Sequence, residues 1–295
     1  MKRFLMICPL LAGILWGCIG IFVRGLNSFD LKALDLVSIR AGITSAFLFV
    51  FLMVFKRSLL KIRLKDIWCF LGTGLASIVF FNFCYFTTIV ETSLALACVL
   101  MYTSPIFVMV LSFFLFKEKM TRRKVISVIL TFIGCLLVTG VIGSGSVLSP
   151  KGLLIGLGSG LGYALYSIFS RFALNRGYHS LTITFYTFLF AFISCLFLTD
   201  NIRIVRIMAS SPASLAYALV FGIAGTAVAY ILYTLGMTAM DNSLAAVIVA
   251  IEPVTATLVG LIFYGESLTL LTFLGIVAVI AGIILSSSPA KPKAA

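Results

Sequence analysis

The sequence feature that most constrains the fold is an internal duplication. Residues 85–134 align with residues 233–282 at an offset of 148 positions, without a gap. Each copy has an apolar segment interrupted by a proline, then a glutamate, then a second apolar segment. Positions identical in the two copies include Tyr85 and Tyr233, Pro105 and Pro253, Glu118 and Glu266, and Gly134 and Gly282. A repeat of this length predicts two structurally equivalent halves.

Composition indicates where these halves reside. Of the 295 residues, 62% are hydrophobic and 11% are charged, whereas soluble domains carry roughly 25% charged residues. Apolar segments long enough to cross a bilayer, which takes about 20 residues per helix, occur at 4–23, 35–55, 66–89, 93–116, 124–142, 152–172, 181–199, 213–238, 243–264 and 268–287. Backbone groups in lipid must bond within their own segment. The sequence therefore predicts an all-α polytopic membrane protein with ten transmembrane helices.

The duplication also includes the first helix of each half. Residues 13–24 resemble residues 160–171, and Trp16 then corresponds to Tyr163. A unit of five crossings reverses the membrane side of the unit that follows it. The sequence thus predicts two inverted five-helix repeats, residues 1–143 and 150–288, related by a pseudo-two-fold axis in the membrane plane. Residues 289–295 are expected to form a short C-terminal tail.

The distribution of positive charge gives the orientation. The net charge is +13, and 16 of the 22 lysines and arginines fall on one side of the predicted helices and five on the other. Because cytoplasmic loops hold the excess of Lys and Arg, both termini are predicted to be cytoplasmic, in the cell membrane. Residues 117–124 carry five basic residues and the aligned 265–272 carry none, as inverted halves require. No extended basic face exists, so nucleic-acid binding is not expected.

The inventory of reactive residues argues against an enzyme. The seven cysteines lie in apolar segments without metal-ligand spacing, and the single histidine, His179, lies in a predicted loop. An intramembrane enzyme needs a nucleophile–base pair or a metal cluster. No HExxH motif and no paired intramembrane aspartates occur. We therefore expect no catalytic residues, no metal and no cofactor.

Two predicted helices in the second half carry polar stripes. In the glycine-rich helix 152–172, Tyr163 and Tyr166 share a face, and in the helix 213–238 Tyr230 and Tyr233 do so. The glycine spacing favours close helix contact. The first-half counterparts of Tyr230 and Tyr233 are Asn82 and Tyr85. Such stripes face a water-filled cavity or protein, and the alternative to a cavity lining is plain hydrogen bonding between helices.

Corresponding breaks are predicted in the fourth and ninth helices. Ser104-Pro105 aligns with Glu252-Pro253, and each proline lies about halfway along its apolar segment. A proline bends a helix and frees a backbone carbonyl. Paired interruptions in two inverted halves are typical of a transporter's binding site.

Two charged residues lie within the predicted helices. Glu252 is the most deeply placed carboxylate, which suits carrying a proton or pairing with a cationic group; the alternative is a structural role at the bend. Arg40 lies about one turn inside the second helix. An ionisable residue at depth is a functional hypothesis, and the alternative is an arginine that snorkels to the headgroups.

Together these residues resemble the EamA type of the drug/metabolite transporter superfamily. The resemblance rests on the doubled arrangement of a small-residue-rich helix, a mid-helix proline and Glu118 or Glu266. It implies a central cavity formed by helices one, three, four, six, eight and nine, and alternating access for small organic solutes such as amino acids. The predicted substrate-binding residues are Trp16, Asn82, Tyr85, Tyr102, Ser104, Tyr163, Tyr166, Tyr230, Tyr233 and Glu252.

Several properties stay open. The expected partners are a small-molecule solute and the lipid bilayer, while proton coupling, assembly as a homodimer and the direction of transport are undetermined. A carrier or flippase for a lipid or a polyprenyl-phosphate-linked molecule is the alternative function. Phosphate recognition favours several arginines in a cavity, and Arg40 is the one candidate in the sequence.

Overall fold

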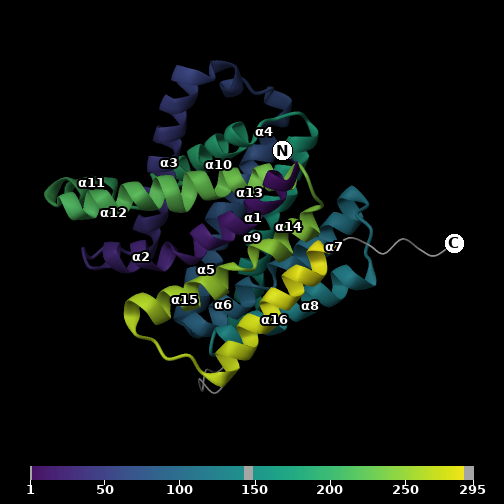
Figure 1. The fold of residues 1–295 in the computed structure, drawn as a ribbon. Coiled ribbons are helices and arrows are strands. Elements are labelled where there is room, and N and C mark those ends of the chain that lie inside the picture. The colour runs from purple at the N-terminus through teal and green to yellow at the C-terminus, as the bar shows by residue number, and fades with distance from the viewer. Residues whose placement is uncertain (1, 143–148, 289–295) are drawn as a thin grey trace.

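The computed structural model describes residues 2–142 and 149–288, and within these ranges the regular structure is entirely helical (Figure 1). Most of the predicted link around residues 144–149, and the predicted tail at 289–295, lie outside the described residues. The prediction of an all-α, multi-pass membrane protein is confirmed by the helix content, the apolar composition and the candidate spans below.

The helices follow the duplicated order of the sequence. The first half contains α1 (Lys2–Gly17), α2 (Ile19–Asn27), α3 (Ala33–Phe55), the short 3₁₀ turns η1 (Arg57–Leu60) and η2 (Leu64–Asp66), α4 (Ile67–Leu71), the π-helical η3 (Gly72–Val79), α5 (Phe80–Glu91), α6 (Leu94–Met101), α7 (Ser104–Phe116) and α8 (Arg122–Val138). The second half contains α9 (Pro150–Asn175), α10 (Ser180–Cys195), α11 (Asn201–Ser210), α12 (Pro212–Gly222), the π-helical η4 (Ile223–Val228), α13 (Ala229–Met237), α14 (Asn242–Val249), α15 (Glu252–Tyr264) and α16 (Leu270–Ser287).

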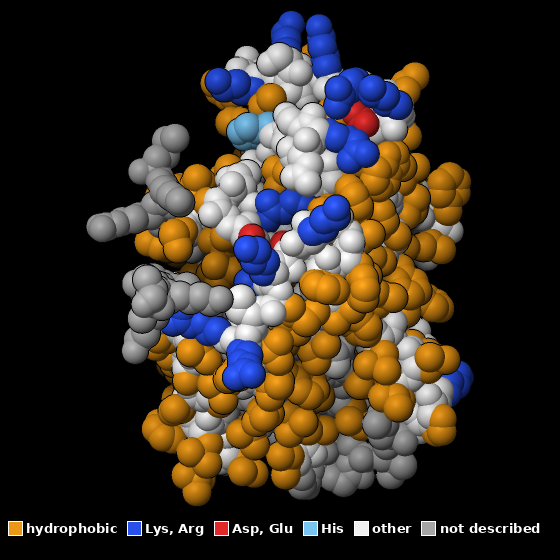
Figure 2. All heavy atoms as spheres, turned by 90° about the vertical axis from the view of Figure 1, so that its right-hand side faces the viewer, with side chains coloured by type: hydrophobic (Ala, Val, Ile, Leu, Met, Phe, Trp, Pro, Cys, Tyr) orange, Lys and Arg blue, Asp and Glu red, His pale blue; other side chains and the backbone are white. Residues whose placement is uncertain are grey.

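Eight helical segments of the described chain are long and apolar enough to cross a membrane. They are Phe4–Asn27, Ala33–Phe55, Leu64–Glu91, Leu94–Phe116, Pro150–Asn175, Pro212–Met237, Asn242–Tyr264 and Leu270–Ser287. The other two predicted segments form shorter helices, α8 with 17 residues and α10 with 16. Figure 2 shows one face of the molecule, on which apolar side chains cover most of the surface and Lys and Arg lie at the top and along the middle of the face. This surface suits contact with lipid between two aqueous sides.

One helix lies outside the predicted spans. In α11 the side chain of Asp200 accepts a hydrogen bond from the backbone N–H of Arg203, which caps the helix start. Ile204 is buried against Leu26 and Leu36 of the first half. This short amphipathic helix therefore packs against the end of α2 and the start of α3.

The first helix of each half packs against the other half. α1 lies along α13, α14 and α15, and α9 lies along α5, α6 and α7. Glycines allow this approach: a Cβ on Gly13 would lie 2.7 Å from the Val249 carbonyl oxygen, and one on Gly17 would lie 2.7 Å from the Glu252 carbonyl oxygen. A Cβ on Gly160 would likewise lie 2.7 Å from the Leu100 carbonyl oxygen. Small residues thus bring α1 and α9 against the backbone of the broken helices.

The helix breaks occur at corresponding places. α6 ends at Met101 and α7 begins at Ser104, while α14 ends at Val249 and α15 begins at Glu252. Each proline is near the start of the second helix, where its missing N–H is not needed. The π-helical segments η3 and η4 interrupt the third and the eighth predicted helices in the same way. Irregular turns of this kind are frequent at functional sites.

Candidate substrate-binding site

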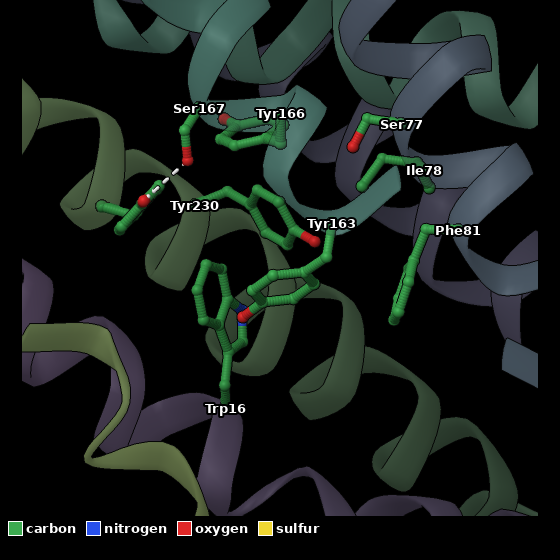
Figure 3. Close-up of a pocket in the computed structure, with 9 residues that line it drawn as sticks. Trp16, Ser77, Ile78, Phe81, Tyr163, Tyr166, Ser167 and Tyr230 are labelled. Atoms are coloured by element: carbon green, nitrogen blue, oxygen red, sulfur yellow. Dashed lines mark hydrogen bonds between the residues drawn. The ribbon is translucent and has the colours of Figure 1, made fainter. Parts of the chain in front are cut away.

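Aromatic side chains from four helices, α1, α5, α9 and α13, surround a cavity inside the bundle (Figure 3). Trp16 of α1 lies with its ring centroid 4.8 Å from that of Tyr230 and 6.0 Å from that of Tyr163, both in edge-to-face contact. Tyr166 also meets Tyr230 edge-on at 4.8 Å. The residues that line the cavity are Trp16, Ser77, Ile78, Phe81, Tyr163, Tyr166, Ser167, Tyr230 and Tyr233. Five of the ten predicted binding residues are therefore found together.

The cavity is small in this conformation. Its volume is about 10 Å³, which is close to the space that a single water molecule needs. Trp16, Tyr166, Tyr230 and Tyr233 are all buried. An organic solute can enter only after the surrounding helices separate.

Glu252 lies directly behind the wall of this cavity. It is the first residue of α15, and the Tyr163 hydroxyl donates a hydrogen bond to its Oε2 at 3.0 Å. The Glu252 carbonyl faces Gly17 of α1. Within residues 2–142 and 149–288, no lysine or arginine forms an ion pair with Glu252. This carboxylate is thus available for a proton or for a positively charged group.

The hydroxyl groups of two other tyrosines are already bonded. Tyr166 and Thr234 share a hydrogen bond of 2.8 Å, and Tyr233 and Ser167 share one of 2.7 Å. Both bonds join α9 to α13. Tyr166 and Tyr233 therefore present ring surface to the cavity, while their hydroxyls hold the two helices together.

The remaining predicted residues lie beside the cavity rather than on it. Tyr85 and Tyr102 belong to an adjoining apolar cluster with Phe81, and the Tyr85 hydroxyl lies 3.1 Å from the Cys98 sulfur. Ser104 is buried at the start of α7. Asn82 bonds to Arg40 and to the backbone of its own helix. These four residues stay predictions that depend on a more open conformation.

The sequence analysis did not select Ser77, Ile78, Phe81 or Ser167. Ser167 follows Tyr163 by four residues and so shares its helix face, which was a usable indication. Phe81 lies four residues after Ser77 on the equivalent face of helix three. An apolar residue on an apolar helix carries no comparable indication, so Ile78 and Phe81 were not predictable from pattern.

A second polar group, which we name the Glu118 network, joins the two halves at one end of the bundle. The Glu118 carboxylate accepts hydrogen bonds from the Asn242 N–H at 2.7 Å and from the Ser243 hydroxyl at 2.7 Å. Arg171 donates to Asn242 Oδ1 and to the Met240 carbonyl, each at 2.6 Å. The network fixes the start of α14 to the end of α7.

The equivalent glutamate of the second half is arranged differently. Glu266 forms an ion pair of 2.9 Å with Arg24, and the two side chains are 53% and 55% exposed. A cavity of about 100 Å³ adjoins Glu266. The helix α14 packs against α7, whereas the corresponding pair α6 and α15 has no comparable contact. The two ends of the molecule thus differ, one joined by a partly buried network and the other by an exposed ion pair.

A multi-pass helical bundle with an aromatic cavity at paired helix breaks is the architecture of a membrane transporter. The EamA-like transporter family matches this chain twice, over residues 3–140 and 150–288, and the chain therefore belongs to that family. Its role is transport rather than catalysis.

Individual relatives agree with this assignment. An uncharacterized transporter of Archaeoglobus fulgidus is 28% identical over 94% of this chain and 93% of its own length. The uncharacterized transporter YxxF of Bacillus subtilis is 27% identical over 95% of this chain and 88% of its own length. A crystal structure with 15% sequence identity superimposes with a TM-score of 0.79 over 97% of both chains, and so shares the fold.

Replacing Trp16 with alanine is expected to weaken transport strongly while leaving the protein folded. Loss of a large aromatic contact at a binding site typically costs 2 kcal/mol or more, or about 30-fold in affinity. The matched control is Trp68→Ala, because Trp68, the other tryptophan of the chain, contacts Phe169 and Phe172 instead of the cavity. Exchange in proteoliposomes and the amount of folded protein in the membrane are both measured. Equal loss of activity in both variants, or loss of folded Trp16→Ala protein, would favour a packing role.

Proposed function

We propose that this protein is a secondary transporter that moves a small organic metabolite, an amino acid or a related solute, across the cytoplasmic membrane by alternating access. The observation that carries the proposal is the position of Glu252 beside a mid-helix break, bonded to Tyr163 of the aromatic cavity. A binding site at the interface of two repeats is the usual arrangement in such carriers. A thermal-shift screen of metabolites can identify this solute, because a ligand that binds the folded protein raises its unfolding temperature.

The topology that we propose has ten membrane spans in two inverted units, residues 1–143 and 150–288. The two family matches and the corresponding helix breaks support two equivalent units. α8 and α10 serve as the two short spans; at 1.5 Å per residue, the 17 residues of α8 extend about 25 Å. Both termini then lie in the cytoplasm.

The difference between the two ends of the molecule supports alternating access. If the two repeats are inverted, the ends at Glu118 and at Glu266 lie on opposite sides of the membrane and occupy corresponding positions in the two repeats. A state closed at the Glu118 network and open toward Glu266 has a counterpart of similar energy in which the two ends exchange roles. Interconversion of the two states carries a solute across.

Glu252 has two possible roles in this cycle, and they differ chemically. As a coupling group it accepts a proton on one side and releases it on the other. As a binding group it holds a cationic part of the solute. Its lack of an ion-pair partner within the described chain is compatible with both.

The proposed topology places the loop after α7 and the loop after α15 on opposite sides of the membrane. Lys119→Cys and Ser267→Cys introduce thiols at exposed positions of the two loops, in a background whose seven native cysteines are replaced. A membrane-impermeant maleimide applied to intact cells should label the cysteine at 267 and should label the one at 119 only after the membrane is permeabilised. Labelling of both from one side refutes the inverted arrangement.

Glu252→Gln tests the two roles of the carboxylate, because glutamine keeps the shape and can still accept the Tyr163 hydrogen bond. A coupling role predicts loss of pH-driven transport with solute exchange retained. A binding role predicts that exchange falls as well, by about 10- to 100-fold. Glu91→Gln serves as the control, since it removes a carboxylate from the surface ion pair with Lys151. A Glu252→Gln variant with normal rate and normal pH profile makes the residue structural.

Glu118→Gln is expected to weaken the Glu118 network and so to loosen the contact between α7 and α14. Glutamine keeps one acceptor oxygen for the donors of Asn242 and Ser243, and hydrogen bonds to a charged group contribute about 1.5–3 kcal/mol. A cysteine at Ser77, which lines the cavity, should then react about tenfold faster with a thiol reagent from the Glu118 side. Glu266→Gln is the matched control and should leave that rate unchanged. Equal rates in the two variants mean that the network does not control access.

A further inference from the structure

Arg40 is a buried charge that the protein itself leaves only partly bonded. It is 8% exposed and is the eighth residue of α3, so it lies about 10 Å along the helix from the start of α3. A charge at such depth is costly and is normally paired. A functional partner is therefore expected.

The contacts of its guanidinium are few. Nη2 donates a hydrogen bond to Asn82 Oδ1 at 3.2 Å, and the buried Nε has no partner. The Phe221 ring centroid lies 6.0 Å from Cζ. No ion pair of Arg40 occurs in the part of the chain that is described. Asp35, one and a half turns earlier on α3, is occupied by Arg203 at 2.6 Å.

A second arginine, Arg171, shows how a structural arginine is bonded in this protein. Its Nε donates to Asn242 Oδ1 and its Nη2 to the Met240 carbonyl, each at 2.6 Å. The same edge of Arg40 has one long bond and one free N–H. This Nε–Nη2 edge is one of the two edges with which arginine binds a carboxylate through two parallel hydrogen bonds. The Nε–Nη2 edge of Arg40 therefore has donor capacity left with which to bind a carboxylate.

Asn82 connects this site to the cavity. Its Nδ2 donates to the Ile78 carbonyl at 2.7 Å, and Ile78 and Ser77 line the cavity wall. Glu252 lies behind a different wall, through Tyr163. Tyr230, which also lines the cavity, contacts the rings of Trp16 and Tyr166. The two groups without an ion pair thus lie behind different walls of the same aromatic cavity, Arg40 behind Ile78 through Asn82 and Glu252 behind Tyr163.

We propose that Arg40 and Asn82 form a carboxylate-binding subsite, in which the solute's carboxylate meets the Nε–Nη2 edge of Arg40 while its ammonium group meets Glu252. This inference rests on the proposed transport function and narrows the solute to a zwitterion. A solute with both charges compensates both buried residues at once and adds no net charge. A solute with one charge leaves either Arg40 or Glu252 uncompensated in a medium where that is costly.

The test compares an amino acid with two analogues, each of which lacks one of its two charged groups. The twenty L-amino acids are screened by thermal shift on the purified wild type, and the strongest binder is compared with its decarboxylated amine and its deaminated acid. Arg40→Gln keeps a donor for Asn82 Oδ1 but removes the charge. We expect this variant to bind the amino acid about 10- to 100-fold more weakly than the wild type, with its affinity for the amine unchanged.

Glu252→Gln provides the reciprocal measurement. This variant should bind the amino acid more weakly than the wild type and bind the deaminated acid with unchanged affinity. Arg206→Gln, at an exposed position of α11, is the control for lost charge and should bind like the wild type. Without ligand, Arg40→Gln should unfold at or above the wild-type temperature, because it removes an uncompensated charge. If Arg40→Gln does not fold, Arg40→Lys keeps the charge without the two-point contact and should still show at least tenfold weaker amino-acid binding.

The subsite is overturned if no amino acid raises the unfolding temperature of the wild type, or if Arg40→Gln binds the amino acid as tightly as the wild type does. It is also overturned if Arg40→Gln loses equal affinity for the amino acid and for the amine. A wild type that exchanges only cationic or uncharged solutes refutes the role of Arg40 while leaving the transport function intact. A wild type that exchanges no solute at all refutes the transport function itself.

Discussion

Close backbone contact at glycines is the constraint on which the rest of this structure depends. In lipid, apolar side chains gain little by meeting one another, so helices associate where small residues allow their backbones to approach. Gly13 and Gly17 place α1 against the broken ninth helix, and Gly160 places α9 against the broken fourth helix. Trp16 lies between the two glycines of α1, and Tyr163 follows Gly160 by three residues. The same contacts that hold the halves together therefore carry the aromatic rings to the helix breaks.

Buried charge is distributed unevenly, and the two charges without an ion pair are the ones that we propose bind the solute. Glu118, Asp35 and Arg171 are each bonded to partners in the protein. Arg40 and Glu252, which lie behind walls of the cavity, have no ion pair within the described residues. Leaving two charges uncompensated lowers the stability of the empty protein. A site that binds a charged solute has to leave these groups incompletely bonded, because a group saturated by the protein has nothing to offer a ligand.

Sequence patterns gave the architecture more fully than the site. The apolar segments, the duplicated helix breaks and the equivalence of Trp16 with Tyr163 follow from periodicity and alignment, because each is a property of one helix or one copy. The partners of Asn82, Tyr85 and Tyr102 depend on how neighbouring helices rotate against each other, and no single helix encodes that rotation. Asn82 is expected on the cavity because Tyr230 is its equivalent, and its bond to Arg40 could not be foreseen from either helix alone. α11 was not predicted because its ten residues are too short and too polar to resemble a span.

The cavity has to grow before it holds a solute, and the structure limits where that growth occurs. The glycine contacts of α1 and α9 leave no slack, since even a Cβ at Gly13, Gly17 or Gly160 would overlap a backbone oxygen. The helix breaks and the π-helical η3 depart from regular α-helical hydrogen bonding, and η3 carries Ser77 and Ile78 on the cavity wall. Movement of η3 would shift this wall and Asn82, which follows η3 in the chain, and would also change the contacts of η3 with α9 and α10. Because Asn82 Oδ1 accepts a hydrogen bond from Arg40, the same movement would alter the bonding of the guanidinium. Enlargement of the cavity and release of Arg40 from Asn82 would then be coupled through the third helix.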